Sequence, residues 1–508
     1  MPVLPVGLYG AGFHADFLRR TAPRMADSLV LLLLISLLLA GCKVGPDYHR
    51  PNPLGTNATP AAFSTMVETN LAEWKSATPA AHLPRGSWWQ IFEEPELARL
   101  ETVALANSPE LAGALARFEQ ARAQINVARS GLFPQFDALP SYNWQRTSFN
   151  EPDSGRAAGV ARTYSTFTMP LQAGWELDLW GRVRRQVESA RATFSASADD
   201  LESARLALQA ELAIDYFTLR ALEREYDVVG RTTDTFQRSL ELTVNRRKGG
   251  VATDFDVSLA ETQLRTAEAE LPALRLQRTR LLNAIASLCG QPATGFSIAV
   301  SAAPQAADPL VPAGVPSELL ERRPDVAAAE QRMASANAQV GVAQSAFYPR
   351  IRFDGLAGFQ SISASTWFDW PSRFWSVGPS LDLPLFTGGR NRAQLALSKA
   401  AYDETVAAYR QTVLGAFQEV EDQLAAQQDL KTQILAENAA LAAAQRTVDI
   451  ANNRYKAGLV TYLEVATAQG SALALERTLV QLQGQKLVAT VGLIKAIGGG
   501  WQAERVQH

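Results

Sequence analysis

Residues 167–179 read FTMPLQAGWELDL, and apolar side chains occupy every odd position of this stretch. The even positions carry polar residues, proline or glycine. A second stretch repeats the pattern, with apolar residues or proline at the odd positions from Trp375 to Leu385. Because side chains alternate between the two faces of a strand, both stretches predict strands with one apolar and one polar face, as in membrane β-barrels. A soluble β-sandwich would show the same alternation.

Each stretch has a more weakly alternating partner, near residues 136–146 and 350–361, so the sequence predicts two β-hairpins. Four strands are too few to close a barrel, which needs about eight. In lipid, an open sheet edge leaves backbone groups unpaired, at a cost of several kcal/mol each. Strands of this kind must therefore close by oligomerisation, and a trimer would supply twelve strands around a water-filled lumen.

Long helical segments follow the two hairpins, over about 182–249 and 390–457, and second helices run on to Gly290 and Gly498. Frequent alanines allow close helix packing. A helix of about 60 residues spans about 90 Å, enough to cross much of a periplasm. A soluble coiled-coil rod is the alternative interpretation of these segments.

The chain contains one unit twice. Residues 109–134 align without a gap on residues 324–349, and eleven of the 26 positions are identical. The turn sequence NRRKGG at 245–250 returns as NRYKAG at 453–458. We therefore expect the following order: signal peptide 1–41, lipidated extended segment 42–94, first repeat 95–300, linker 301–317, second repeat 318–500 and tail 501–508.

The composition argues against several classes of function. A formal net charge of -3 gives no basic stripe for nucleic acid. Four His and two Cys leave no usable metal-site spacing, and no phosphate-binding loop, dinucleotide fingerprint or nucleophile elbow is present. We therefore expect no enzyme, no metal and no cofactor. Cys289, beside Gly290, is expected to be a small buried hydrophobe.

The amino terminus resembles a bacterial lipoprotein signal. Residues 29–40 are apolar except for Ser36, which is too short for a membrane span and suits a signal-peptide core. The run ends in LAGC at 39–42, a lipobox-like sequence, so Cys42 is the expected lipidation site. Lys43 follows it, and the absence of Asp at that position favours the outer membrane. An ordinary signal peptide with a chance cysteine is the alternative.

Several motifs together resemble the TolC-like outer-membrane factors, and specifically the NodT-type efflux lipoproteins. They occur in family order from Cys42 to about Trp501: CKVGPDYHRP at 42–51, WWQIF at 88–92, WELDLWGR at 175–182, PSELLERRPD at 316–325, LPLFTGG at 383–389 and QEVED at 418–422. The resemblance implies an α+β membrane protein. The implied fold class is a homotrimeric twelve-stranded outer-membrane β-barrel, with four strands per protomer, continuous with a long periplasmic α-helical barrel.

The same resemblance implies the exit duct of a tripartite efflux pump for drugs, solvents or metal ions. The implied partners are a periplasmic adaptor, an inner-membrane transporter of the resistance–nodulation–division type and outer-membrane lipid. A type I protein-secretion duct is an alternative, which Cys42 disfavours because such ducts often lack the lipobox. A lipid-tethered periplasmic coiled-coil scaffold is another, which predicts no membrane strands.

Family pattern also places the functional residues of the periplasmic tip. Asp256 and Glu464 occupy matching positions after the two glycine turns, and converging acids in a pore favour cations. They are expected to form a gate with Asp254 and Tyr455, the latter tying neighbouring helices together. The alternative for the acids is stabilisation of a helix N-terminus. The turns at Gly250 and Gly458 are expected to dock the adaptor, or simply to end helices. No basic residue follows the second turn at 459–461 to lock the tip.

Overall fold

In the computed structural model, the described residues are 43–54, 86–148, 163–300, 309 and 322–499. They fall into two compact units. Unit 1 contains residues 43–49, 122–192 and 334–404, and unit 2 contains the remaining ones. The predicted signal peptide at 1–41, Cys42, the tail at 501–508 and all of the linker at 301–317 except residue 309 lie outside the described residues.

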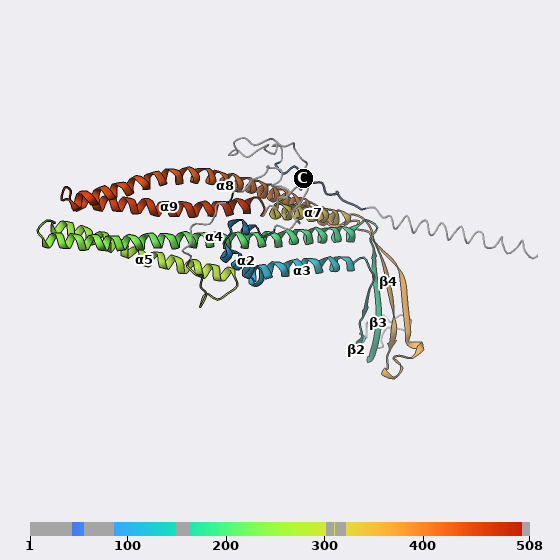
Figure 1. Ribbon diagram of the computed structural model, residues 1–508. Coiled ribbons are helices and arrows are strands. Elements are labelled where there is room, and N and C mark those ends of the chain that lie inside the picture. Colours follow the sequence, from blue (N-terminus) through green and yellow to red (C-terminus); the bar gives the residue numbers. More distant parts are fainter. Residues whose placement is uncertain (1–42, 55–85, 149–162, 301–308, 310–321, 500–508) are drawn as a thin grey trace, which may run out of the picture. The chain divides into compact units, whose positions relative to one another are not determined.

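The helices confirm the internal duplication (Figure 1). Three pairs have equal lengths, of 22, 67 and 35 residues. These pairs are α3 (Pro109–Ser130) with α7 (Pro324–Ser345), α4 (Arg182–Lys248) with α8 (Arg390–Lys456), and α5 (Asp254–Leu288) with α9 (Tyr462–Ala496). Proline begins α3 and α7 because the first turn of a helix needs no backbone donor. None of the described helices is long and apolar enough to span a membrane.

Unit 1 contains one antiparallel sheet. Its strands are β1 (Gln135–Ala138), β2 (Ser141–Arg146), β3 (Thr163–Leu177), β4 (Arg350–Ser361) and β5 (Arg373–Asp382). Both β1 and β2 pair with β3, which pairs with β4, which pairs with β5. The sheet therefore has four strand positions, as predicted, and Figure 1 shows β3 and β4 side by side. Short 3-10 turns, η2 (Ala364–Thr366) and η3 (Trp370–Ser372), join β4 to β5.

The structure differs from the predicted strands at several points. The first strand is interrupted at residues 139–140, where Pro140 has no N–H for the ladder. β3 begins four residues before Phe167, because residues 163–166 pair with β2. β5 ends at Asp382, although the alternation continues to Leu385. Alternation records which face a residue occupies, and it does not record where the hydrogen-bonded partner strand stops.

Unit 2 has its apolar core around the WWQIF motif. That motif forms the 3-10 helix η1 (Trp88–Phe92), which is followed by α2 (Pro95–Asn107). Trp88, Trp89 and Phe92 are buried against apolar side chains of α4, α5 and α9. Trp88 donates its indole N–H to Gln209 Oε1 over 3.2 Å, which satisfies the polar atom of a buried ring. Within this unit α4 runs beside α5 and α8 beside α9 (Figure 1).

Cys289 confirms its sequence interpretation. It is fully buried in the same core, and burial raises the pKa of its thiol to about 11. A thiol in this environment stays protonated and packs as a small apolar group.

Candidate functional site

One face of the sheet is apolar and exposed to the surroundings. The register places Trp175 opposite Phe353, and Gly355 opposite Val377. Opposite residues of an antiparallel pair lie on the same face, so the apolar odd positions of β3, β4 and β5 form one surface. Trp144 and Trp375 on this face each expose 74% of their area. An uncovered apolar surface of this kind marks a contact with lipid or protein.

The opposite face of the sheet is mostly polar, with Leu356 and Phe374 as apolar exceptions. The even-numbered residues of β3, β4 and β5 lie on this face and include the charged and hydroxyl groups. Ser380 Oγ of β5 donates to Asp354 Oδ2 of β4 over 2.7 Å. The sheet is thus amphipathic across its thickness, as the alternation predicted.

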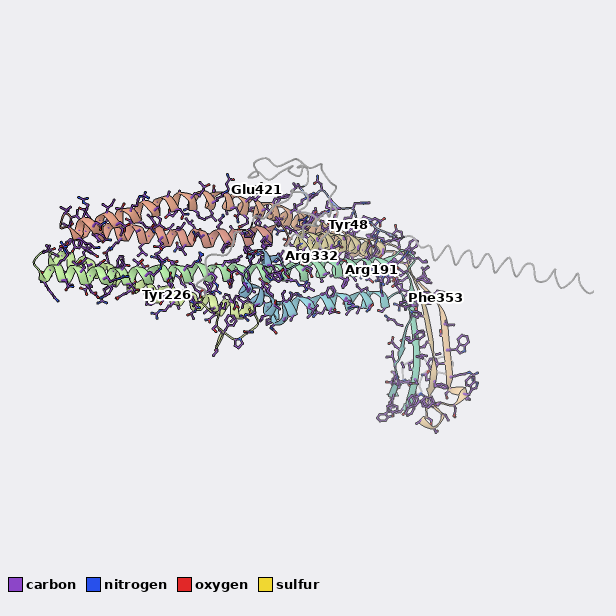
Figure 2. The ribbon with its side chains drawn as sticks, viewed as in Figure 1. Tyr48, Arg191, Tyr226, Arg332, Phe353 and Glu421 are labelled. Carbon is purple, nitrogen blue, oxygen red and sulfur yellow. The ribbon has the colours of Figure 1, made fainter. Side chains whose placement is uncertain are left out.

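Aromatic side chains gather near both ends of the long strands. At the hairpin end, Phe167 lies 4.8 Å from Tyr142 and 5.4 Å from Trp367, measured between ring centroids. At the other end, Trp175 stacks on Phe353, which Figure 2 shows where the strands approach the helices of unit 1. The stretch from Phe167 to Trp175 contains nine residues, and a strand that crosses a membrane needs about 9–11. Two aromatic girdles flanking an apolar band are typical of outer-membrane strands.

The glycine turns end both long helices in the same geometry. Gly250 and Gly458 have φ of 73° and 76°, a left-handed conformation that favours glycine. At each turn, the glycine N–H and the next N–H donate back to the last turn of the helix. This is a Schellman motif, so helix termination explains both glycines. A Cβ at Gly250 would contact nothing within 4 Å, and one at Gly458 would meet only the end of the flexible Arg246 side chain at 4.0 Å.

Asp256 lies in a helix cap. Its Oδ2 accepts from the backbone N–H of Thr253 over 2.9 Å and from the Thr253 hydroxyl over 2.8 Å, while Thr253 Oγ1 accepts from the Asp256 N–H. The side chain is 8% exposed. This reciprocal capping box is the helix-terminus alternative for Asp256. The spacing of Thr253 and Asp256 is a sequence signature of such a cap.

The other two predicted gate acids are exposed. Glu464 occupies the position in α9 that matches Asp256, but its N-cap residue Thr461 makes no side-chain cap bond. Glu464 instead lies 3.8 Å from the Arg454 guanidinium. Asp254 forms an ion pair with Arg247. The two repeats therefore treat equivalent acids differently.

Tyr455 joins α8 to α4 within unit 2. Its hydroxyl donates to Thr243 Oγ1 over 3.4 Å, and the Arg246 guanidinium lies 4.7 Å above its ring. Arg246 also donates to the Lys456 carbonyl over 3.2 Å. Tyr455 therefore contacts a neighbouring helix of the same chain, and sequence reasoning missed Arg246 as the cationic part of this contact; its role in a closed tip stays a prediction. A stacked guanidinium is attracted by the negative face of the aromatic ring.

A second set of contacts joins α5 to α9 just beyond the turns. The Tyr462 hydroxyl donates to Gln263 Oε1 over 3.1 Å, and Gln263 Nε2 donates to the Ala466 carbonyl over 2.8 Å. Burial raises the pKa of Tyr462 to about 12, so this hydroxyl stays a donor. Beside it, an open groove of about 660 Å³ lies between α8 and α9, with Ile450 and Leu463 among its apolar lining residues and Arg454 and Glu464 among its charged ones.

Two family motifs meet at the end of α9. Arg323, from the motif at 316–325, donates to Asp325 over 2.6 Å, to Glu419 over 2.6 Å and to the Ala496 carbonyl over 2.9 Å. Glu419 belongs to the QEVED motif. Arg323 thus caps the carboxyl end of α9, where a cation is favoured by the helix dipole.

The segment after Cys42 is held by a buried arginine, which sequence reasoning also missed. Arg185 in α4 donates to the carbonyls of Val44 and Gly45, over 3.1 and 2.9 Å, and its side chain is fully buried. Gly45 has φ of 98°, and a Cβ there would collide with the Cα of Gly341. This close crossing explains the glycine of the VGPDY motif. Cys42 itself, the predicted lipidation site, lies outside the described residues.

An exposed apolar sheet with aromatic girdles, together with long paired helices that end in open turns, defines the class of outer-membrane channels. The family model of the outer membrane efflux proteins matches residues 101–291 and 315–499. The chain belongs to this family.

Individual relatives agree with that assignment. The chain is 35% identical over 482 residues to the outer membrane protein OprJ of Pseudomonas aeruginosa, covering 94% of this chain and 96% of OprJ. It is 28% identical to the cation efflux system protein CusC of Escherichia coli, covering 94% and 100% of the two chains. Among solved structures, the outer-membrane channel OprN superposes with a TM-score of 0.80 at 29% identity, covering 91% of this chain and 100% of OprN.

These comparisons confirm the predicted family, fold class, efflux function and outer-membrane location. The chain has the protomer fold of an outer-membrane efflux channel, and its relatives are transport proteins. The coiled-coil scaffold alternative predicted no membrane strands, and the amphipathic sheet argues against it.

Proposed function

We propose that three copies of this chain close their strands into one barrel and form the exit duct of a tripartite efflux pump. The observation that supports this most directly is the sheet. It has two outer strand positions, β1/β2 and β5, and neither pairs with a further strand among the described residues. Its uncovered apolar face suits lipid, where such edges must pair. Three sheets joined edge to edge would provide twelve strands and leave a lumen lined by the polar face.

The proposed partners are those of an efflux pump, because relatives are named as outer membrane proteins of such pumps. A periplasmic adaptor and an inner-membrane transporter, of the resistance–nodulation–division type, would supply cargo and drive. Relatives are named for the efflux of antibiotics, toluene and cations and for the export of pyoverdine, so we propose a small-molecule cargo. The open turns at Gly250 and Gly458 and the groove between α8 and α9 are the surfaces proposed for the adaptor.

The proposed gate combines a contact between two helices, made by Tyr455 and Arg246, with an exposed acid, Glu464. Tyr455, stacked under Arg246, holds the α8 tip against the α4 tip, and Arg246 supplies the cation that residues 459–461 lack. Glu464, which is exposed, is the proposed cation-selective acid, and Asp254, the exposed acid two residues before Asp256, is a second candidate in the first repeat. Asp256 supports the gate indirectly, because its cap fixes the start of α5.

Cys42 is the proposed lipid attachment site. The contacts of Arg185 with Val44 and Gly45 hold the chain two residues beyond it, which suits a fixed anchor point. Replacing Cys42→Ser should abolish metabolic labelling with palmitate, whereas persistent labelling would contradict this assignment.

The export function is tested in cells that lack their own outer-membrane ducts. This chain, produced together with a periplasmic adaptor and a resistance–nodulation–division transporter, should lower the accumulation of a fluorescent pump substrate. The matched control is the same pair without this chain. Equal accumulation in both strains would contradict the proposed function.

A further inference from the structure

A small basic pocket lies in unit 1 beside the amino-terminal segment. Its volume is about 360 Å³, and it is lined by Lys43, Leu132, Arg184, Val187, Glu188 and Arg191. Three of these six residues are cations and two are aliphatic. The pocket therefore offers positive charge next to an apolar wall.

The charges in and around the pocket do not cancel. Lys43 Nζ lies 2.6 Å from Glu188, which also accepts from the buried Arg185 over 3.0 Å, and Arg184 contacts Asp178 over 3.3 Å. Asp47 is the remaining acid, 3.1 Å from Arg185 and 3.9 Å from Lys43.

Four cations therefore face three carboxylates, which leaves one positive charge in excess. Arg191 is the cation without a carboxylate partner among the described residues, and Figure 2 shows it on the part of α4 that belongs to unit 1.

The pocket touches residues that mark a membrane interface. The carbonyl of its wall residue Leu132 accepts the indole N–H of Trp175 over 3.0 Å, and Trp175 belongs to the aromatic girdle at the end of the strands away from the hairpins. The backbone N–H of Val44, the residue after Lys43, donates to the carbonyl of Trp180 over 3.0 Å. Trp180 lies three residues beyond the end of β3. Tryptophans at the end of membrane strands lie at the level of the lipid headgroups.

We infer that this pocket binds the phosphate of an anionic phospholipid. A guanidinium matches the geometry of a phosphate, and Arg191 is available for it. Leu132 and Val187 provide an apolar surface for the glycerol and the first acyl carbons. Basic pockets at the headgroup level are a known way of binding anionic lipids. The inference rests on the outer-membrane location of the channel and is independent of acylation at Cys42.

Native mass spectrometry of the purified, delipidated channel tests the inference. The wild-type channel titrated with phosphatidylglycerol should retain it in preference to phosphatidylcholine. Arg191→Gln should weaken retention about fivefold, the size expected for one cation near a membrane surface. The matched control is Arg129→Gln, an exposed arginine of α3 in the same unit that does not line the pocket, and it should leave retention unchanged.

Three results would overturn the inference. Equal retention of the two lipids would show no anion preference, and equal losses in both variants would show a diffuse charge effect. Displacement of phosphatidylglycerol by millimolar inorganic phosphate would show a site for the free anion. Heat-modifiable migration of each variant on gels checks separately that the channel itself is assembled.

Discussion

At the scale of single residues, equivalent positions of the two repeats have acquired different roles. Asp256 is committed to a cap, whereas Glu464 remains exposed beside Arg454. The cap could be predicted from the sequence, because Thr253 and Asp256 have the spacing of a capping box. The contact between Arg246 and Tyr455 could not be predicted, because the two residues are more than two hundred positions apart and no local sequence pattern indicates the contact.

The gate can be tested in planar-bilayer recordings. Tyr455→Leu removes both the stacking surface for Arg246 and the hydrogen bond to Thr243, so the conductance of the resting channel should rise several-fold. Tyr226→Leu, at an exposed tyrosine labelled in Figure 2, is the matched control and should leave conductance unchanged. In the same recordings Glu464→Gln should reduce cation selectivity. Wild-type conductance and selectivity in these variants would contradict the gate.

Glu101 predicts a pH dependence of stability. Its side chain is fully buried, neither carboxyl oxygen has a hydrogen-bond partner, and burial raises its pKa from the ordinary value of 4.5 to about 9. The folded state therefore holds a proton that the unfolded state releases. The corresponding stability is present below pH 4.5 and is lost as the pH rises towards 9. Glu101→Gln should remove this loss, which circular dichroism melts at pH 5 and pH 8.5 would measure. An identical pH slope in the variant would contradict it.

At the scale of elements, the period-2 pattern predicted all four strand positions and the face that each side chain occupies. The break at Pro140 and the end of β5 at Asp382 were missed, because both depend on which partner groups are available for pairing. Helix termination was predictable from Gly250 and Gly458. The crossing of Gly45 over Gly341 was not, because it is a tertiary contact.

Neighbouring residues of β5 provide a matched test of the lipid face. Val377 lies on the apolar face and Ser376 on the polar face. Val377→Arg should destabilise the inserted sheet by about 2–4 kcal/mol, the cost of this residue type facing lipid near the bilayer midplane. Ser376→Arg should be tolerated, since it would face water. The fraction of heat-modifiable, membrane-inserted protein on gels measures both. Equal tolerance of the two changes would contradict the assignment of faces.

At the scale of the whole molecule, the chain is incomplete as a membrane protein. Each copy supplies four strand positions with two unpaired outer edges and one uncovered apolar face among the described residues. Counting strands in the sequence already required an oligomer, because the closure of a sheet in lipid is a geometric condition. The number of copies depends on how many strands a barrel needs to enclose a lumen. No single residue of the sequence determines that number.

The most direct test is the molar mass of the mature channel in detergent, measured by light scattering with the detergent contribution subtracted. The account predicts three times the mass of one mature chain, with strand signal in circular dichroism. A folded species with the mass of a single chain and an intact β-sheet would contradict it.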